Sequence, residues 1–271
     1  MPVDLHLLAT RLIDAQDRSH TLPPIAAGMP DFDVEAAYAV LAEIEQRRVA
    51  QGWQRRGRKI GFTNRTIWPR YGVFQPMVAS VWRHTLHLAP DGHAHLPLRG
   101  FVQPRIEPEV VFGLRDSVPL HADAAAVLAA TAWIAAGFEI VQSHFPQWRF
   151  AAADCTAAFG LHAALVVGTP FTLTDADRAA LERRLPAFEV TLRRDGALVD
   201  RGVGANVLDS PALALAHAAS VIAAHPAFPP LAAGELVTTG TISDAWPVAA
   251  GETWTSDYGT LGVRGLALTL A

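Results

Sequence analysis

The sequence predicts an α+β fold, with a helical amino-terminal segment at residues 1–52 and a β-rich core at residues 53–271. Helical periodicity dominates the first fifty residues, whereas short apolar runs separated by turn residues dominate the rest. The core also lacks the regular strand–helix alternation of a doubly wound sheet, and it contains no Gly-x-Gly-x-x-Gly loop. We therefore expect strands that pair in hairpins and irregular sheets.

Two helices are expected in the amino-terminal segment. The first lies within residues 1–20 and buries one face, formed by Leu5, Leu8, Leu12 and Ala15. Two consecutive prolines at positions 23 and 24 end this pattern. Asp33 then provides an amino-terminal cap for a second helix that continues to about Arg48.

The first half of the core is expected to consist mainly of strands. In chain order, we expect a strand at 59–63, a loop at 68–73, a hairpin of 84–88 and 95–98 around Asp91-Gly92, a strand at 109–114, an alanine-rich helix at 122–136, a strand containing Glu139, and a strand at 161–167.

The second half of the core carries the strongest local signals. Asp195-Gly196 is a two-residue turn between apolar runs and predicts a hairpin of 188–193 with 197–201. Ser210-Pro211 places a capping residue before a proline, which indicates a helix that runs to Ala224. The remaining expected elements are a helix from Thr174 to Leu185 and strands at 236–241, 253–258 and 263–270.

Composition excludes several classes of protein. The chain has 271 residues, 51% of them hydrophobic, and a net charge of -4 with scattered basic residues, so we expect no nucleic-acid partner. We find no apolar run near the roughly 18 residues of a membrane span, and Asp4 and Arg11 interrupt the amino terminus, unlike a signal peptide. The single cysteine excludes an internal disulfide, and we expect a cytoplasmic protein with no membrane partner.

Three glutamates suggest a metal site. Glu107 and Glu109 are two residues apart on an extended segment, so their side chains share one face, and an apolar run follows them. Glu139 lies in a second apolar strand. Three converging carboxylates would form an all-oxygen site that suits Mg²⁺ or Mn²⁺. The alternative is a solvated strand face, because most carboxylates are exposed.

Two further residues are candidates for chemistry. Lys59 is followed by Ile60-Gly61-Phe62, and a partly desolvated lysine could exchange protons or orient an anionic substrate. Asp154 lies among small residues that permit close approach of a ligand. The alternatives are a surface lysine and an aspartate that caps a turn. Cys155 is better explained as a small buried thiol than as a nucleophile.

These motifs, taken together, resemble the 2-keto-4-pentenoate hydratase and 4-oxalocrotonate decarboxylase family of the fumarylacetoacetate hydrolase superfamily. The resemblance covers essentially the whole chain in the right order. Its main segments are Lys59-Ile60-Gly61-Phe62-Thr63, Tyr71-Gly72-Val73, Pro104-Arg105-Ile106-Glu107-Pro108-Glu109, Glu139-Ile140-Val141, Asp154, Gly204–Leu208, Leu231–Thr241 and Asp257–Gly262.

The resemblance implies a β-rich roll that binds Mg²⁺ or Mn²⁺ through Glu107, Glu109 and Glu139. It also implies that a 2-oxo acid chelates this metal, which stabilises the enolate form of the substrate. It implies that Lys59 is the active-site lysine. The remaining implied site residues are Asp154 and Gln142 as catalytic residues, and Gly61, Thr63 and Thr241 as substrate contacts. Gln142 and His144 stand where the family usually has an aspartate and an arginine.

The expected function is a hydratase of a small unsaturated 2-oxo acid, acting as a homo-oligomer. The alternatives are a 2-oxo acid decarboxylase, an acylpyruvate C–C hydrolase, a catalytically weak partner subunit and a metal-free β-rich domain. Because His144 replaces an arginine, a second substrate carboxylate is less expected. Residues that suggest an apolar substrate tail are Trp68, Tyr71, Val73 and Phe74.

Overall fold

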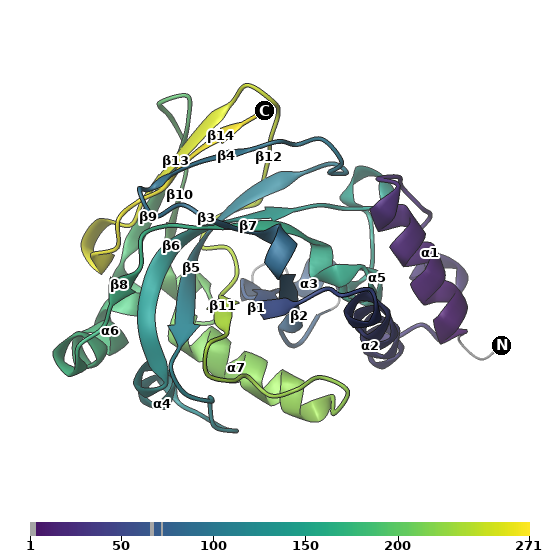
Figure 1. The fold of residues 1–271 in the computed structure, drawn as a ribbon, viewed down its shortest axis with the longest axis horizontal. Coiled ribbons are helices and arrows are strands. Elements are labelled where there is room, and N and C mark those ends of the chain that lie inside the picture. Colours follow the sequence, from purple (N-terminus) through teal and green to yellow (C-terminus); the bar gives the residue numbers. More distant parts are fainter. Residues whose placement is uncertain (1–3, 66–67, 72) are drawn as a thin grey trace.

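The fold is α+β and consists of two curled sheets with helices packed around them, as predicted (Figure 1). The computed structural model describes residues 4–65, 68–71 and 73–271. Within these residues, the larger sheet has nine strands, with the order β2-β1-β11-β5-β6-β7-β3 and with β12 and β8 paired to β5 and β6. The second sheet has five strands, in the order β10-β9-β13-β14-β4.

The elements have the following bounds. The helices are α1 Leu5–Asp17, α2 Val34–Ala50, α3 Trp68–Tyr71, α4 Ala124–Ala129, α5 Ala152–Ala157, α6 Asp175–Ala187 and α7 Pro211–Ala224. The strands of the larger sheet are β1 Arg55–Gly61, β2 Met77–Trp82, β3 Leu86–Leu88, β5 Arg105–Leu114, β6 Thr131–Val141, β7 His162–Val167, β8 Phe171–Thr172, β11 Leu236–Thr238 and β12 Trp246–Pro247. The strands of the second sheet are β4 His93–Leu96, β9 Glu189–Arg194, β10 Ala197–Val203, β13 Thr253–Asp257 and β14 Ala267–Leu270.

The second amino-terminal helix begins at its predicted cap. The Asp33 carboxylate accepts the Ala36 N–H at 2.9 Å, which satisfies one free donor at the start of α2. Helix α1 packs on α2, and α2 packs on α5, at the end of the molecule where the amino terminus lies (Figure 1). The helical segment is thus joined to the core through α5.

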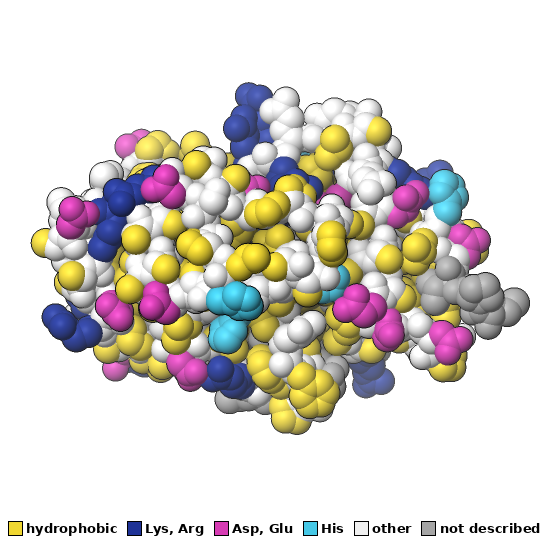
Figure 2. Space-filling model, turned by 90° about the horizontal axis from the view of Figure 1, so that it is seen from below, with side chains coloured by type: hydrophobic (Ala, Val, Ile, Leu, Met, Phe, Trp, Pro, Cys, Tyr) yellow, Lys and Arg dark blue, Asp and Glu magenta, His cyan; other side chains and the backbone are white. Residues whose placement is uncertain are grey.

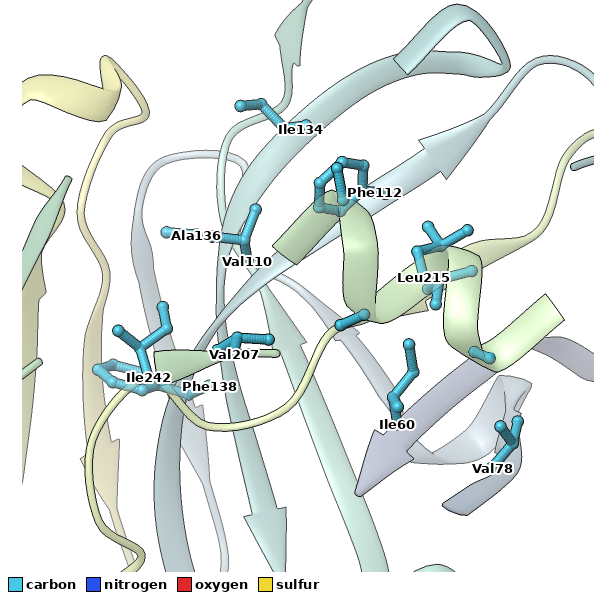
Figure 3. Packing of buried hydrophobic residues seen from close by; sticks show 14 of the residues in the cluster. Ile60, Val78, Val110, Phe112, Ile134, Ala136, Phe138, Val207, Leu215 and Ile242 are labelled. Atoms are coloured by element: carbon cyan, nitrogen blue, oxygen red, sulfur yellow. The ribbon is translucent and has the colours of Figure 1, made fainter. Parts of the chain in front are cut away.

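The larger sheet has an apolar face that packs against α7. Residues 110, 112, 134, 136 and 138 alternate along β5 and β6 onto this face, together with Ile60 of β1 and Val78 of β2. Figure 3 shows these side chains in one cluster with Leu215 of α7 and with Val207. The opposite face carries Glu107, Glu109, Glu139 and Lys59, since side chains alternate along each strand.

The hairpin expected at residues 84–98 does not form. Strand β3 pairs in parallel with β7 in the larger sheet, whereas β4 pairs in parallel with β14 in the second sheet. Asp91-Gly92 does mark a turn, in which the Gly92 N–H donates to the Ala89 carbonyl at 2.9 Å. The chain uses this turn to cross from one sheet to the other, which a local turn signal cannot reveal.

The alanine-rich helix expected at 122–136 ends at Ala129, and β6 begins at Thr131. Strand β6 pairs with β5 along its length, and the Trp133 ring lies over Gly113, where a Cβ would meet a ring atom at 1.9 Å. The small alanine side chains fit a densely packed sheet, so strand pairing overrides helix propensity here.

Smaller differences concern helix α7 and the last strands. Strand β11 ends at Thr238 and β14 begins at Ala267, so both are shorter than expected. The Ser210 side chain makes no capping hydrogen bond to α7. By length and composition alone, residues 204–224 could cross a membrane, in contrast to our expectation, but most of this segment is buried inside the protein. A core helix of a soluble protein passes the same test.

Candidate active site

Strands β5 and β6 bring the three glutamates together on one face of the larger sheet. Glu107 pairs directly with Glu139 across the ladder, and Glu109 lies opposite Gly137. One carboxylate oxygen from each residue lies within 4.8 Å of the others. Glu109 and Glu139 are fully buried. Like charges directly opposite each other destabilise a sheet, so this arrangement requires a positive partner.

Each of the two buried glutamates has one oxygen that is held and one that is not. Glu109 Oε2 accepts hydrogen bonds from the Thr238 hydroxyl and from the Gly240 N–H, the latter at 2.6 Å. Glu139 Oε1 lies 2.7 Å from His162 Nδ1. Among the described residues, Glu109 Oε1 and Glu139 Oε2 are buried without a hydrogen bond of good geometry, and Glu139 Oε2 is ion-paired with Lys59 Nζ. Two such oxygens in an all-oxygen cluster fit a divalent cation.

Lys59 lies beside these carboxylates and is the sole lysine of the sequence. Strand β1 is central in its part of the sheet, paired with β11 and with β2, and the Lys59 side chain is 3% exposed. Its Nζ lies 3.2 Å from Glu139 Oε2 and donates to the Gly160 carbonyl at 3.0 Å. The structure therefore excludes the alternative of a surface lysine.

The pKa values of this cluster follow from burial and mutual charge. Burial opposes the charge on Lys59, but Glu139, Glu107 and Glu109 together raise its pKa. The lysine is thus a cation at neutral pH, rather than a base with a depressed pKa. Burial raises the pKa of Glu107 to about 7 against the influence of Lys59.

The two deepest acids differ in pKa. Burial and the charges of Glu139 and Glu107 raise the pKa of Glu109 well above its usual value. Burial also opposes ionisation of Glu139, but Lys59 and the hydrogen bond with His162 lower its pKa. A cation bound here would favour the ionised carboxylates and so oppose the upward pKa shifts of Glu107 and Glu109.

A cavity of about 380 Å³ opens onto this cluster. Lys59 and Glu107 line it, together with the three residues predicted to contact substrate: Gly61, Thr63 and Thr241. Gly240 has a φ of +93°, and a Cβ there would lie 2.0 Å from Thr63 Oγ1, so glycine is needed beside the Glu109 carboxylate. Substrate contact by these three residues stays a prediction.

The structure does not bring Asp154 to the cavity. Its Oδ1 accepts the N–H groups of Ile25 at 2.7 Å and Ala26 at 3.0 Å, and its Oδ2 accepts the Ala151 N–H at 2.8 Å. These bonds cap α5 and fix the connection between α1 and α2. The geometry favours the alternative of a capping aspartate. In addition, Asp154 links α5 to the distant connection between α1 and α2.

Gln142 and His144 also lie outside the cavity lining. Gln142 Oε1 accepts the Val102 N–H at 3.0 Å, and His144 Nδ1 lies 3.0 Å from the His20 carbonyl oxygen. Both side chains are buried and hold loops together. The structure thus gives Gln142 a loop-holding contact in place of the predicted catalytic position.

Of the loop residues that suggested an apolar tail pocket, the three with described side chains, Trp68, Val73 and Phe74, are not on the cavity walls. Val73 and Phe74 line a separate hollow of about 160 Å³, and Phe74 is 88% exposed. Trp68 Nε1 donates to the Phe62 carbonyl at 2.8 Å. The Tyr71 side chain lies outside the described residues. The apolar walls come instead from Phe62, Met77, Val141, Trp148, Phe150 and Leu161.

Sequence reasoning missed three residues at the site. Arg105 lines the cavity, and its guanidinium lies 4.3 Å from the centre of the Trp148 ring. Arg105 lies two residues before Glu107 on the same strand. Because strand side chains alternate, this spacing would have predicted that Arg105 is on the same face of the sheet as Glu107. Thr238 and His162 contact the carboxylates from strands that no local pattern pairs with β5 and β6.

Comparison with known proteins agrees with this geometry. The family model described as "Fumarylacetoacetate (FAA) hydrolase C-terminal" matches residues 74–264. The chain belongs to this family. The 2-keto-4-pentenoate hydratase of Paraburkholderia phymatum is 32% identical over 257 residues, which cover 94% of each chain. The resemblance stated from sequence is thereby confirmed.

Two relatives carry the decarboxylase name. The 4-oxalocrotonate decarboxylase of Pseudomonas sp. strain CF600 is 29% identical, over 93% of this family member and 91% of the relative. The solved structure of 4-oxalocrotonate decarboxylase from Pseudomonas putida G7, complexed with magnesium and adipate, superposes with a TM-score of 0.87. It is 23% identical and covers 98% of this chain and 97% of its own, which confirms the fold.

Asp154→Ala should lower the free energy of unfolding by about 3 kcal/mol or more, because it leaves three backbone donors without their acceptor. Urea unfolding followed by circular dichroism would measure this loss. Asp33→Ala removes a single exposed cap and should cost only about 1 kcal/mol. Equal losses for the two variants would contradict the link from Asp154 to the connection between α1 and α2.

Proposed function

We propose that this protein is a divalent-metal-dependent lyase that adds water to a small unsaturated 2-oxo acid. The carboxylate cluster carries the proposal, because Glu109 presents a buried oxygen without a hydrogen-bond partner in the same cluster as a Glu139 oxygen that is ion-paired with Lys59. Such oxygens are costly unless a cation receives them. Relatives named as hydratases support the choice of reaction.

Glu107, Glu109 and Glu139 would hold the metal. Their oxygen donors suit a hard cation, and we propose Mg²⁺ or Mn²⁺. A divalent cation bound there would supply Lewis acidity to the carbonyl oxygen of a 2-oxo acid. Related structures complexed with magnesium and with Mn²⁺ support this choice.

Lys59 would act on the charge that the reaction creates. Water addition at the alkene carbon conjugated with the carbonyl places negative charge on the oxygen at C2, until the neighbouring carbon accepts a proton. The buried ammonium lies at the cavity wall and can stabilise that charge and donate a proton. An arginine could not release a proton in this way.

The cavity favours a small substrate. Its volume of about 380 Å³ is near the lower end of ligand pockets, which is roughly 300 Å³. The aromatic and aliphatic walls formed by Phe62, Trp148, Phe150 and Leu161 suit the apolar part of an unsaturated chain. We therefore retain a monocarboxylic 2-oxo acid as the proposed substrate, with different wall residues from those first expected.

A decarboxylase is the second candidate, and Arg105 is the observation that favours it. His144 lies away from the cavity, so its replacement of an arginine does not decide the question. Arg105 lies two residues before Glu107, roughly 7 Å along the strand, on the cavity wall. A guanidinium there could hold the second carboxylate of a dicarboxylic 2-oxo acid.

We further propose a cytoplasmic homo-oligomer without nucleic-acid or membrane partners, built from a helical segment at 1–52 and a catalytic core at 53–271. The single cysteine is buried and unpaired, in keeping with a reducing compartment. On the face seen in Figure 2, basic side chains are dispersed among acidic and apolar ones. Leu88, Leu120 and Phe74 expose large apolar surfaces that self-association would cover.

Glu109→Gln should weaken Mn²⁺ binding by at least about tenfold, because it replaces a ligand oxygen whose partner oxygen is fixed by Thr238 and Gly240. Isothermal titration of the purified chain would measure the affinity. The exposed Glu189→Gln serves as a control for loss of one negative charge. An unchanged affinity in Glu109→Gln would argue against the metal site.

Lys59→Ala should lower kcat/KM by about 10²-fold, the usual scale for a general acid. The assay follows ultraviolet absorbance of 2-hydroxypenta-2,4-dienoate with Mg²⁺, on the purified chain alone. Arg56→Ala removes an exposed cation from the same strand and should leave the rate unchanged. A loss below about threefold in folded Lys59→Ala would remove this residue from the mechanism.

Product analysis by NMR in deuterated water separates the two reactions. We expect a hydrated product from 2-hydroxypenta-2,4-dienoate, because the cavity walls suit a monocarboxylic acid. Carbon dioxide release from a dicarboxylic analogue, without hydration of either compound, would favour the decarboxylase. In that case, Arg105→Gln should raise KM for the dicarboxylate.

A further inference from the structure

His162 contacts the carboxylate cluster from outside the cavity. Its ring is buried, with Nδ1 at 2.7 Å from Glu139 Oε1 and Nε2 at 2.8 Å from Thr85 Oγ1. We propose that His162, held by Thr85, is a positioning residue that fixes the Glu139 carboxylate for the cation. This inference rests on the metal-dependent function proposed above.

The hydrogen-bond chain determines how the ring is held. An ionised carboxylate can only accept, so Nδ1 donates its hydrogen to Glu139. The Thr85 hydroxyl accepts the Trp82 N–H at 3.2 Å and lies 3.0 Å from the Trp82 carbonyl oxygen. Thr85 belongs to the tight turn Arg83–Thr85, and its position is therefore set by the backbone. Both ring nitrogens of His162 are occupied, which leaves the ring little freedom to rotate.

A β-bulge places His162 on the correct face of the sheet. In the β6–β7 ladder, Glu139 pairs with Leu165 and Ile140 with Ala164, but Val141 pairs with His162. Ala163 is thus an extra residue in β7. In a regular strand, residues 162 and 165 would face opposite sides, because side chains alternate. The bulge brings His162 to the face of Glu139, a common use of bulges beside active sites.

As a consequence, the two carboxylate oxygens of Glu139 have different contacts. His162 occupies Oε1, whereas Oε2 is directed to the cluster and is ion-paired with Lys59 Nζ at 3.2 Å. The same pattern holds for Glu109, where Thr238 and Gly240 occupy one oxygen. Partners that orient a ligand in this way commonly change metal affinity by about 10–100-fold.

The test measures Mn²⁺ affinity through the electron paramagnetic resonance signal of free Mn²⁺, which does not depend on activity. His162→Phe keeps ring volume but removes both hydrogen bonds, and should weaken binding by about 10–100-fold. Thr85→Val changes only a hydroxyl to a methyl group and should weaken binding by at least about threefold. His225→Asn removes another buried histidine, one that stacks on Tyr38, and should leave the affinity within about twofold.

Each outcome decides the inference. Wild-type affinity in folded His162→Phe overturns it, and if that variant does not fold, wild-type affinity in Thr85→Val does so. An equal weakening in His225→Asn also overturns it, because the effect would then follow from any loss of stability. Absence of Mn²⁺ binding by the unaltered chain overturns the metal centre as well, which distinguishes the two failures.

Discussion

The cost of holding three carboxylates together on one sheet face, two of them fully buried, is the constraint on which the site depends. Glu107 and Glu139 are directly paired, and Glu109 and Glu139 are withdrawn from water. Each charge removed from water must be received by a donor or a cation. Strands β11 and β7, which flank β5 and β6, and strand β1 beyond β11 meet this need. Strand β1 supplies Lys59, β11 supplies Thr238, and β7 supplies His162. The order of the strands in the sheet therefore determines which side chains are close enough to stabilise the carboxylates.

One face of the larger sheet forms the apolar core that stabilises the fold, and the opposite face carries the candidate active site. One face packs Val110, Phe112 and their neighbours against α7, in a continuous apolar core. This burial provides the driving force that lets the other face carry unfavourable groups. Such a division is possible only because strand side chains alternate, so a two-residue spacing assigns each residue to a face. Ala163 interrupts the alternation once, and that interruption adds His162 to the site.

Sequence reasoning succeeded where a local rule decides the structure. The turn Asp195-Gly196, the cap Asp33 and the alternation of Glu107 and Glu109 need no distant partner to be interpreted, and the structure contains all three features. It failed where pairing over long distances decides. Residues 84–98 divide between two sheets, and Ala132–Ala136 form a strand because β5 lies beside them. Asp154 was misplaced for the same reason, since its acceptors serve Ile25 and Ala26, more than a hundred residues away.

The position of the sole lysine has a practical consequence. A protease specific for lysine has one cleavage point in this chain, and it lies in β1, hydrogen-bonded on both sides by β2 and β11. Cleavage there requires β1 to leave the sheet, because a protease needs an extended and accessible backbone. The rate of this single cut therefore reports how often the strand opens, at the level of local unfolding. Arginine-specific cleavage at an exposed position outside the sheets, such as Arg65, would carry no such information.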